Sequence, residues 1–297
     1  MRHVTNVQAR AAVTGAIVVS MLCVRVLDAQ LFPAGDAVMT MGHVLLNVSD
    51  VAAHREFWTR QFDAKPVRVG TLEGVTIPGV VVLFRVQPPA GPSEGTVINH
   101  MGLKLNTLAN FTARFDKAGL KYDPPRIGRE KTPQTYVTGP DGFRMELVED
   151  PRIPAPAVSH HLHYWLEQPL EVKKWYVQKL LLKPTMRGPY ESGDVPGMNL
   201  TLAPLGSQKV AGVPMKGRLM DSIGFDVPNL KRYVDTIAAN GVTFDVPYGR
   251  DPELGLMTAT LTDPWGATIR LTEGLNKIAG VTPYTYIDGY VVVRPLN

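Results

Sequence analysis

Cysteine is almost absent from this chain: Cys23 is the only one among 297 residues. A single thiol cannot form a disulfide within the chain. Cys23 also lies in an N-terminal segment that we interpret below as a leader, so the mature chain is expected to lack thiol chemistry altogether. A chain of this length, enough for about two domains, can bury a sufficient apolar core without disulfides.

Runs of basic residues interleaved with aromatics are also missing, although the formal net charge is +4. Such runs form the electrostatic surface of nucleic-acid-binding proteins. The sequence therefore gives no support for a nucleic-acid partner. Removal of residues 1–29 would take away Arg2, Arg10, Arg25 and Asp28 and lower the net charge from +4 to +2.

Apolar runs long enough to cross a membrane are lacking too. The longest candidate extends from Ala11 to Val24, which is short of the ~20 residues that a membrane-spanning helix needs. Basic residues precede this run, and Ala29 is a small residue placed before Gln30. This pattern predicts a signal peptide over residues 1–29 and an exported protein, periplasmic or secreted, with no membrane span in the mature chain. The alternative is an uncleaved N-terminal anchor.

Glycine and proline, in contrast, are plentiful, with 27 and 25 residues. Together with 44% hydrophobic residues they indicate a globular protein of short strands and tight turns. Gly139 to Glu149 is one example, because Pro140, Asp141 and Gly142 form a turn before a strand that carries Glu146 among apolar neighbours. A carboxylate inside such a strand needs a reason, since Glu is rarely buried without a partner.

The chain also repeats one pattern of strand, helix and further strands four times. The four strand-helix segments are Met41–Lys65, Ile98–Gly119, His160–Lys183 and Met220–Gly241. The closing strands repeat as well, because PDGFRMELVE at 140–149 and PWGATIRLTE at 264–273 align without a gap. A fixed period of this kind indicates a fold built from repeated units.

Four such units resemble the vicinal oxygen chelate superfamily, which includes glyoxalases, fosfomycin-resistance enzymes, bleomycin-binding proteins and extradiol dioxygenases. The resemblance implies an α+β fold in which tandem βαβββ units form two cup-shaped, mostly antiparallel sheet modules. It places one module at residues 38–150 and a degenerate one at 157–275. The tail, residues 276–297, would add an edge strand or a lid.

The resemblance also implies a metal site, because in that family the ligands lie on the first strand of each unit and on a last strand. These positions hold His43, His100 and Glu146 in the first module. In the second module His161 matches His43, but Ser222 and Arg270 replace the other two ligands, and arginine does not ligate metals. One divalent metal site is therefore expected, with Fe²⁺, Mn²⁺, Zn²⁺ or Ni²⁺ all compatible with imidazole and carboxylate ligands.

Which histidine completes this site depends on how the units pair. If consecutive units share a sheet, the set is His43, His100 and Glu146. If the units pair crosswise, the set is His161, His100 and Glu146, and the proline-containing link from 151 to 156 is long enough for either arrangement. We prefer the first set, because the strand GHVLLNV around His43 fits the family pattern better than HHLHYWL.

Nearby polar residues are further candidates, because side chains alternate along a strand. Asn47 shares the face of His43, Lys104 that of His100, and His163 that of His161. Asn47 and Lys104 could orient an anionic substrate, with solvated positions as the simpler interpretation. His163 is a candidate for the cavity lining.

Two functions remain open from the sequence. The first is a metal-dependent enzyme whose small substrate chelates the metal through adjacent oxygens, either a glyoxalase-like lyase or isomerase or an extradiol-type dioxygenase. The second is a non-catalytic protein that binds or sequesters a small molecule, as bleomycin-resistance proteins do. Those relatives generally lack the ligand set, so metal binding separates the two hypotheses.

Overall fold

The computed structural model describes residues 31–297 except 154, 207–209, 281–284, 288–289 and 293–297. The predicted leader and Cys23 lie outside the described residues. Within them, no helix is both long and apolar enough to span a membrane.

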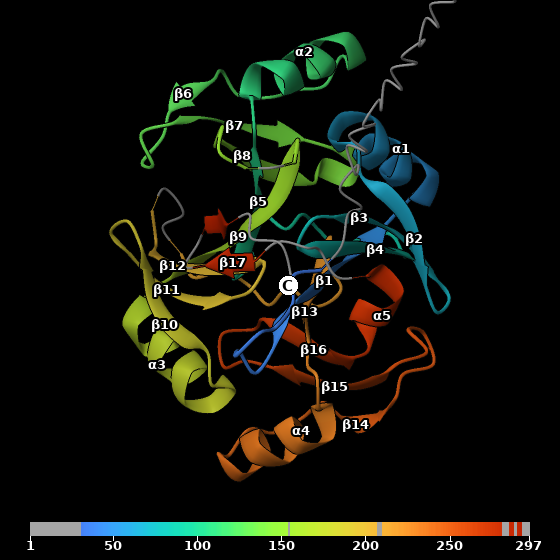
Figure 1. The fold of residues 1–297 in the computed structure, drawn as a ribbon, viewed down its shortest axis with the longest axis vertical. Coiled ribbons are helices and arrows are strands. Elements are labelled where there is room, and N and C mark those ends of the chain that lie inside the picture. Colours follow the sequence, from blue (N-terminus) through green and yellow to red (C-terminus); the bar gives the residue numbers. More distant parts are fainter. Residues whose placement is uncertain (1–30, 154, 207–209, 281–284, 288–289, 293–297) are drawn as a thin grey trace, which may run out of the picture.

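The first half of the chain contains two βαβββ units, as predicted (Figure 1). The first consists of β1 (Thr40–Val48), α1 (Val51–Phe62), β2 (Lys65–Val69), β3 (Leu72–Ile77) and β4 (Val80–Val86). The second consists of β5 (Ile98–Leu105), α2 (Leu108–Ala118), β6 (Arg126–Ile127), β7 (Pro133–Thr138) and β8 (Arg144–Glu149). A short 3₁₀ turn at Pro140–Gly142 precedes β8.

The second half repeats this arrangement. The third unit consists of β9 (Ala157–Leu166), α3 (Pro169–Leu180), β10 (Lys183–Arg187), β11 (Tyr190–Val195) and β12 (Met198–Pro204). The fourth consists of β13 (Met220–Asp226), α4 (Leu230–Ala239), β14 (Val246–Arg250), β15 (Met257–Thr262) and β16 (Thr268–Glu273). The tail adds α5 (Leu275–Ala279) and the strands β17 (Thr285–Ile287) and β18 (Tyr290–Val292), which pair with each other and join neither large sheet.

The units pair crosswise into two eight-stranded sheets. One sheet has the order β14-β15-β16-β13-β1-β4-β3-β2 and the other β10-β11-β12-β9-β5-β8-β7-β6. The ranges 38–150 and 157–275 therefore each contribute half of both sheets, and our preference for consecutive pairing is wrong. The physical reason is that the first strands meet as the antiparallel pairs β1·β13 and β5·β9, which join the first unit to the fourth and the second to the third.

The turn before β8 is tied to the first helix. Asp50 caps α1 by accepting from the backbone N–H groups of Ala52 and Ala53, as expected for an Asp at this position. Asp141, in the left-handed region at φ 53°, accepts from the Ser49 N–H at 2.9 Å and lies 3.1 Å from Nε2 of His54. The turn before β8 is thus held against α1, a helix of the first unit, whose strands belong to the other large sheet.

Candidate metal centre

Three neighbouring strands of one sheet bring four ligand-type side chains together. In the β5·β9 pair His100 stands opposite His163 and Gly102 opposite His161, and in the β5·β8 pair Gly102 stands opposite Glu146. Because residues two apart share a face, all four side chains project to the same side. Their ligand atoms lie within 4.8 Å of one another, and all four residues are buried.

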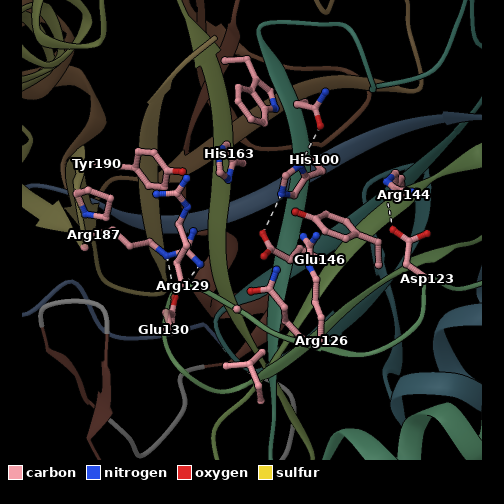
Figure 2. Close-up of a pocket in the computed structure, with 18 of the residues that line it drawn as sticks. His100, Asp123, Arg126, Arg129, Glu130, Arg144, Glu146, His163, Arg187 and Tyr190 are labelled. Atoms are coloured by element: carbon pink, nitrogen blue, oxygen red, sulfur yellow. Dashed lines mark hydrogen bonds and ion pairs between the residues drawn. The ribbon is translucent and has the colours of Figure 1, made fainter. Parts of the chain in front are cut away.

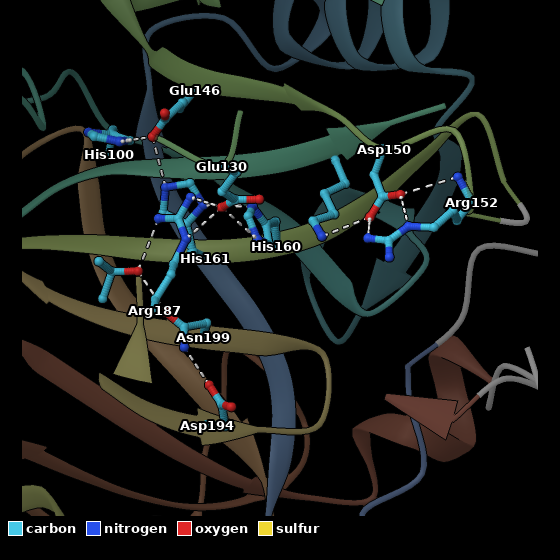
Figure 3. A network of polar contacts seen from close by, with 12 residues as sticks. His100, Glu130, Glu146, Asp150, Arg152, His160, His161, Arg187, Asp194 and Asn199 are labelled. Carbon is cyan, nitrogen blue, oxygen red and sulfur yellow. Dashed lines mark hydrogen bonds and ion pairs between the residues drawn. The ribbon is translucent and has the colours of Figure 1, made fainter. Parts of the chain in front are cut away.

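Glu146 is the centre of this group (Figure 3). Its Oε2 lies 3.1 Å from Nε2 of His100 and 3.0 Å from Nε2 of His161. Ligands about 2.1 Å from a common divalent ion are about 3–3.5 Å apart in a tetrahedral or octahedral site. Both distances from the Glu146 oxygen therefore match those between ligands of one ion.

Gly102 makes room for the His161 ring. A Cβ atom added at Gly102 would lie 2.0 Å from Cε1 of His161, far inside van der Waals contact. The ring lies flat over the backbone of the central strand because no side chain stands there. Glycine at this position is therefore part of the geometry that aims His161 at Glu146.

The ring nitrogens of His100 and His163 also fit a cation. Nδ1 of His100 lies 2.9 Å from the amide oxygen of Asn99, an acceptor, so Nδ1 donates in this contact and Nε2 is directed at Glu146. At 3.1 Å from the carboxylate oxygen, Nε2 has either a proton or a metal ion between the two atoms. Among the described residues neither nitrogen of His163 has a hydrogen-bond partner, although the residue is buried. An unpartnered buried imidazole suits a metal or a bound ligand.

A polar network contacts the His161 ring at Nδ1, the nitrogen that does not face Glu146 (Figure 3). Nδ1 of His161 lies 3.1 Å from Nδ1 of His160, and Nε2 of His160 lies 3.7 Å from Glu130. Arg187 donates to the same Glu130 carboxylate at 2.7 and 3.0 Å. Contacts of this kind fix the orientation of a ligating ring and are a usual second layer of metal sites.

Burial and the contacts within the group shift the pKa values of several of its members. Burial lowers the pKa of His161 from 6.5 to about 3, assisted by the Arg187 charge, and lowers the pKa of His160 and His163 as well. For Glu146, burial by itself would raise the pKa, but the contacts with His100 and His161 outweigh it and hold this pKa well below its usual range. A neutral His161 beside an ionised Glu146 is the form in which these two side chains bind a metal.

The group forms the floor of a cavity of about 870 Å³. His100, Glu146 and His163 line this cavity (Figure 2), whereas His161 is not among its lining residues. The walls are aromatic and basic, and consist of Tyr136, Trp165 and Tyr190 together with Arg126, Arg129, Arg144 and Arg187, interspersed with Glu94, Asp123 and Glu130. The volume is that of a small-molecule site.

Our sequence analysis did not identify these wall residues. Tyr136 stands opposite Glu146 in the β7·β8 pair, and burial followed by the Glu146 charge raises its pKa. Trp165 shares a strand face with His161 and His163, so strand alternation could have identified it. Arg187 and Tyr190 flank the β10–β11 turn, whose position over the site depends on tertiary structure alone.

Asn47 and Lys104 do not reach the cavity. Asn47 is fully buried and donates to Asp221 at 3.1 Å. Lys104 is buried and donates to Asp150 at 2.9 Å. Both earlier interpretations, substrate contact and solvated position, are therefore wrong, because each side chain pairs with a carboxylate inside the protein.

His43 lies in the other sheet, where the same register recurs without the ligands. His43 stands opposite Gly224, and Gly224 opposite Arg270. Ser222 takes the place of His100, and Leu45, opposite Ser222, takes that of His163. Of the two histidine alternatives, the structure therefore brings His161 to Glu146, and not His43.

This second cup is closed by its own side chains. An apolar cluster fills it, made of Leu31, Leu45, Val69, Leu72, Val81, Leu83, Leu254 and Leu275. At its polar end Glu253 accepts from Arg85 at 2.6 and 2.7 Å and from Arg270 at 3.1 Å. The guanidinium group of Arg270 thus takes the position that Glu146 has in the sheet with the metal-ligand group.

Glu253→Gln should destabilise the fold by about 2 kcal/mol, because it leaves two partly buried guanidinium groups without a full counter-charge. Urea unfolding measures the loss, and Glu171→Gln, at an exposed position on α3, is the control that should change little. Burial would raise the Glu253 pKa, but Arg85 and Arg270 outweigh it and lower this pKa from 4.5. The difference in free energy of unfolding between wild type and Glu253→Gln should therefore be complete above pH 4.5 and decrease as acid protonates Glu253. A difference that increases in acid would contradict this prediction.

Comparison with known proteins agrees with this architecture. The sequence profile of the Glyoxalase/Bleomycin resistance protein/Dioxygenase superfamily matches residues 40–147 and 158–271. The chain therefore belongs to this superfamily, and the predicted resemblance is confirmed.

Individual relatives are more distant. Cadmium-induced protein CadI of Mycobacterium tuberculosis is 30% identical over 122 residues, which cover 37% of this chain and 75% of that protein. Glyoxalase I from Zea mays has a similar fold, with a TM-score of 0.62 at 15% identity over 81% of this chain and 96% of that chain. A putative dioxygenase from Bacillus subtilis also has a similar fold, with a TM-score of 0.58 at 14% identity over 82% of this chain and 91% of that chain. These structural similarities define the fold alone.

Proposed function

We propose that this protein is a metal-dependent enzyme whose small substrate chelates the metal through adjacent oxygens. The observation that supports this most directly is that His100, Glu146 and His161 converge beside a cavity. His163 lies next to them, and its ring nitrogens have no hydrogen-bond partner among the described residues. His100, Glu146 and His161 would hold the metal. A divalent ion in this position supplies Lewis acidity toward substrate oxygens.

The chain's own residues would orient the substrate. His163 faces the cavity and is free to exchange a hydrogen bond or proton with a substrate hydroxyl. Its ring stacks on Trp165, with centroids 5.1 Å apart and planes 29° apart, and the Tyr190 ring lies 5.8 Å from His163. Flat apolar walls of this kind favour a planar ring. Of the two reaction classes, they favour ring cleavage by a dioxygenase over glyoxalase-like lyase or isomerase chemistry.

Metal loading followed by activity assay tests this proposal. The purified protein is loaded anaerobically with Fe²⁺, Mn²⁺, Zn²⁺ or Ni²⁺, and Cd²⁺ is included because a relative is named as cadmium-induced. The bound metal is counted, and the iron form is then mixed with catechols in air. Oxygen uptake coupled to ring-fission colour would support the dioxygenase. Activity on a hemithioacetal without oxygen uptake would support the lyase.

The alternative function is small-molecule binding without catalysis, as in bleomycin-resistance proteins. The large aromatic and basic cavity favours a binding role in either case. Tight ligand binding combined with metal content far below one equivalent after loading would select this alternative.

We also propose that the protein is exported and cleaved before Gln30. The mature protein recovered from an exported fraction should begin at Gln30 in intact-mass measurement. Residues 2–29 still attached to membrane-bound protein would support the anchor instead.

A further inference from the structure

The cavity walls carry four arginines, and two of them are already neutralised. Arg144 donates to Asp123 at 2.7 Å, and Arg187 donates to Glu130 at 2.7 Å. These pairs are part of the wall, and their charge is balanced within the protein.

The other two arginines have no such balance. Among the described residues neither Arg126 nor Arg129 has a carboxylate partner, and both are exposed. Each guanidinium rests over an aromatic ring, Arg126 at 5.9 Å from the Tyr136 centroid and Arg129 at 5.1 Å from the Tyr190 centroid. Stacking on a ring limits the motion of a guanidinium and leaves its N–H groups free in its plane.

The two arginines stand on either side of the ligand group. Figure 2 shows Arg129 with Tyr190 on one side of His100 and Glu146, and Arg126 on the other. Both come from the segment between α2 and β7. The remaining lining carboxylate, Glu94, comes from a different segment, the connection between β4 and β5. The positive charge without a carboxylate partner among the described residues therefore comes from one exposed segment of the cavity wall, residues 126–129.

We propose that Arg126 and Arg129 bind an anionic group on the substrate, at the end remote from the chelating oxygens. Guanidinium groups bind carboxylate and phosphate oxygens in a two-pronged geometry. The aromatic walls receive the ring, and His100, Glu146 and His163 at the floor receive the oxygens. The substrate class is thus a small ring compound with adjacent oxygens at one end and a carboxylate or phosphate at the other. The position of the oxygens rests on the proposed function; the anion site does not.

Ligand pairs that differ only in the anion test this proposal. Calorimetry on the metal-free protein compares phenol with benzoate and phenyl phosphate, which lack adjacent oxygens and need no metal. Calorimetry on the metal-loaded protein compares catechol with its carboxylated derivative protocatechuate. We expect the anionic member to bind more tightly, and the preference between benzoate and phenyl phosphate identifies the group.

The variant Arg126→Gln/Arg129→Gln should weaken binding of the anionic ligands about tenfold and leave phenol and catechol unchanged. The control Arg60→Gln/Arg232→Gln removes the same charge from exposed positions on α1 and α4 and should change neither. The inference is overturned if the anionic ligands bind no better than the neutral ones, or if both double variants behave alike. If the wild-type protein takes up no metal but prefers benzoate to phenol, and Arg126→Gln/Arg129→Gln loses this preference, the anion site stands and the proposed function is refuted.

Discussion

Glu146→Gln should lower the affinity for divalent metal by about 100-fold or more while the fold is retained. Glu146 is the only anionic member of the ligand group, and one of its oxygens lies 3.0 to 3.1 Å from both imidazoles. The neutral amide has the same shape but offers a weaker ligand and no charge to balance a divalent ion. Metal content after dialysis and metal titration by calorimetry measure the effect, and near-ultraviolet circular dichroism verifies the fold.

The matched control for this variant is Glu149→Gln. Glu149 lies three residues further along β8, where its side chain accepts from the Leu108 N–H at 2.7 Å. Glutamine keeps an oxygen for that contact, and the change in net charge is the same. Metal affinity should therefore remain normal in the control. Wild-type affinity in Glu146→Gln would remove this residue from the site.

His161→Ala should abolish tight metal binding, and His43→Ala should leave it close to normal. The two histidines are matched structurally: both are fully buried, and each lies over a glycine whose added Cβ would be 2.0 Å from its ring. Only His161 approaches Glu146, at 3.0 Å. Both variants create a similar cavity, so both should lose stability by a similar amount.

The measurement is metal titration of each folded variant, with urea unfolding in parallel. If only His161→Ala loses metal while both variants are equally destabilised, the effect comes from the lost ligand and not from lower stability. Loss of metal in both variants, or in neither, would contradict the assignment of His161.

The sequence by itself determined the units and two of the ligand-type residues. His100 and Glu146 belong to one βαβββ unit, in which β5 and β8 are adjacent parallel strands. The pattern of strand, helix and strands sets that adjacency locally, so both residues share a site whichever way the units combine. The turn at Pro140–Gly142 also fixes which residues of β8 face the cavity, since strand alternation does the rest.

Only the tertiary structure decided which histidine joins them. His43 and His161 occupy equivalent positions on equivalent strands, and β1 and β9 are both almost entirely buried and both antiparallel to their partners. No local pattern states whether β5 pairs with β1 or with β9, because that choice depends on the packing of all four units. The cavity walls were equally inaccessible to prediction. Arg126 lies in β6, Arg129 follows it and Tyr190 begins β11, and long-range contacts set the place of these short segments at the cavity.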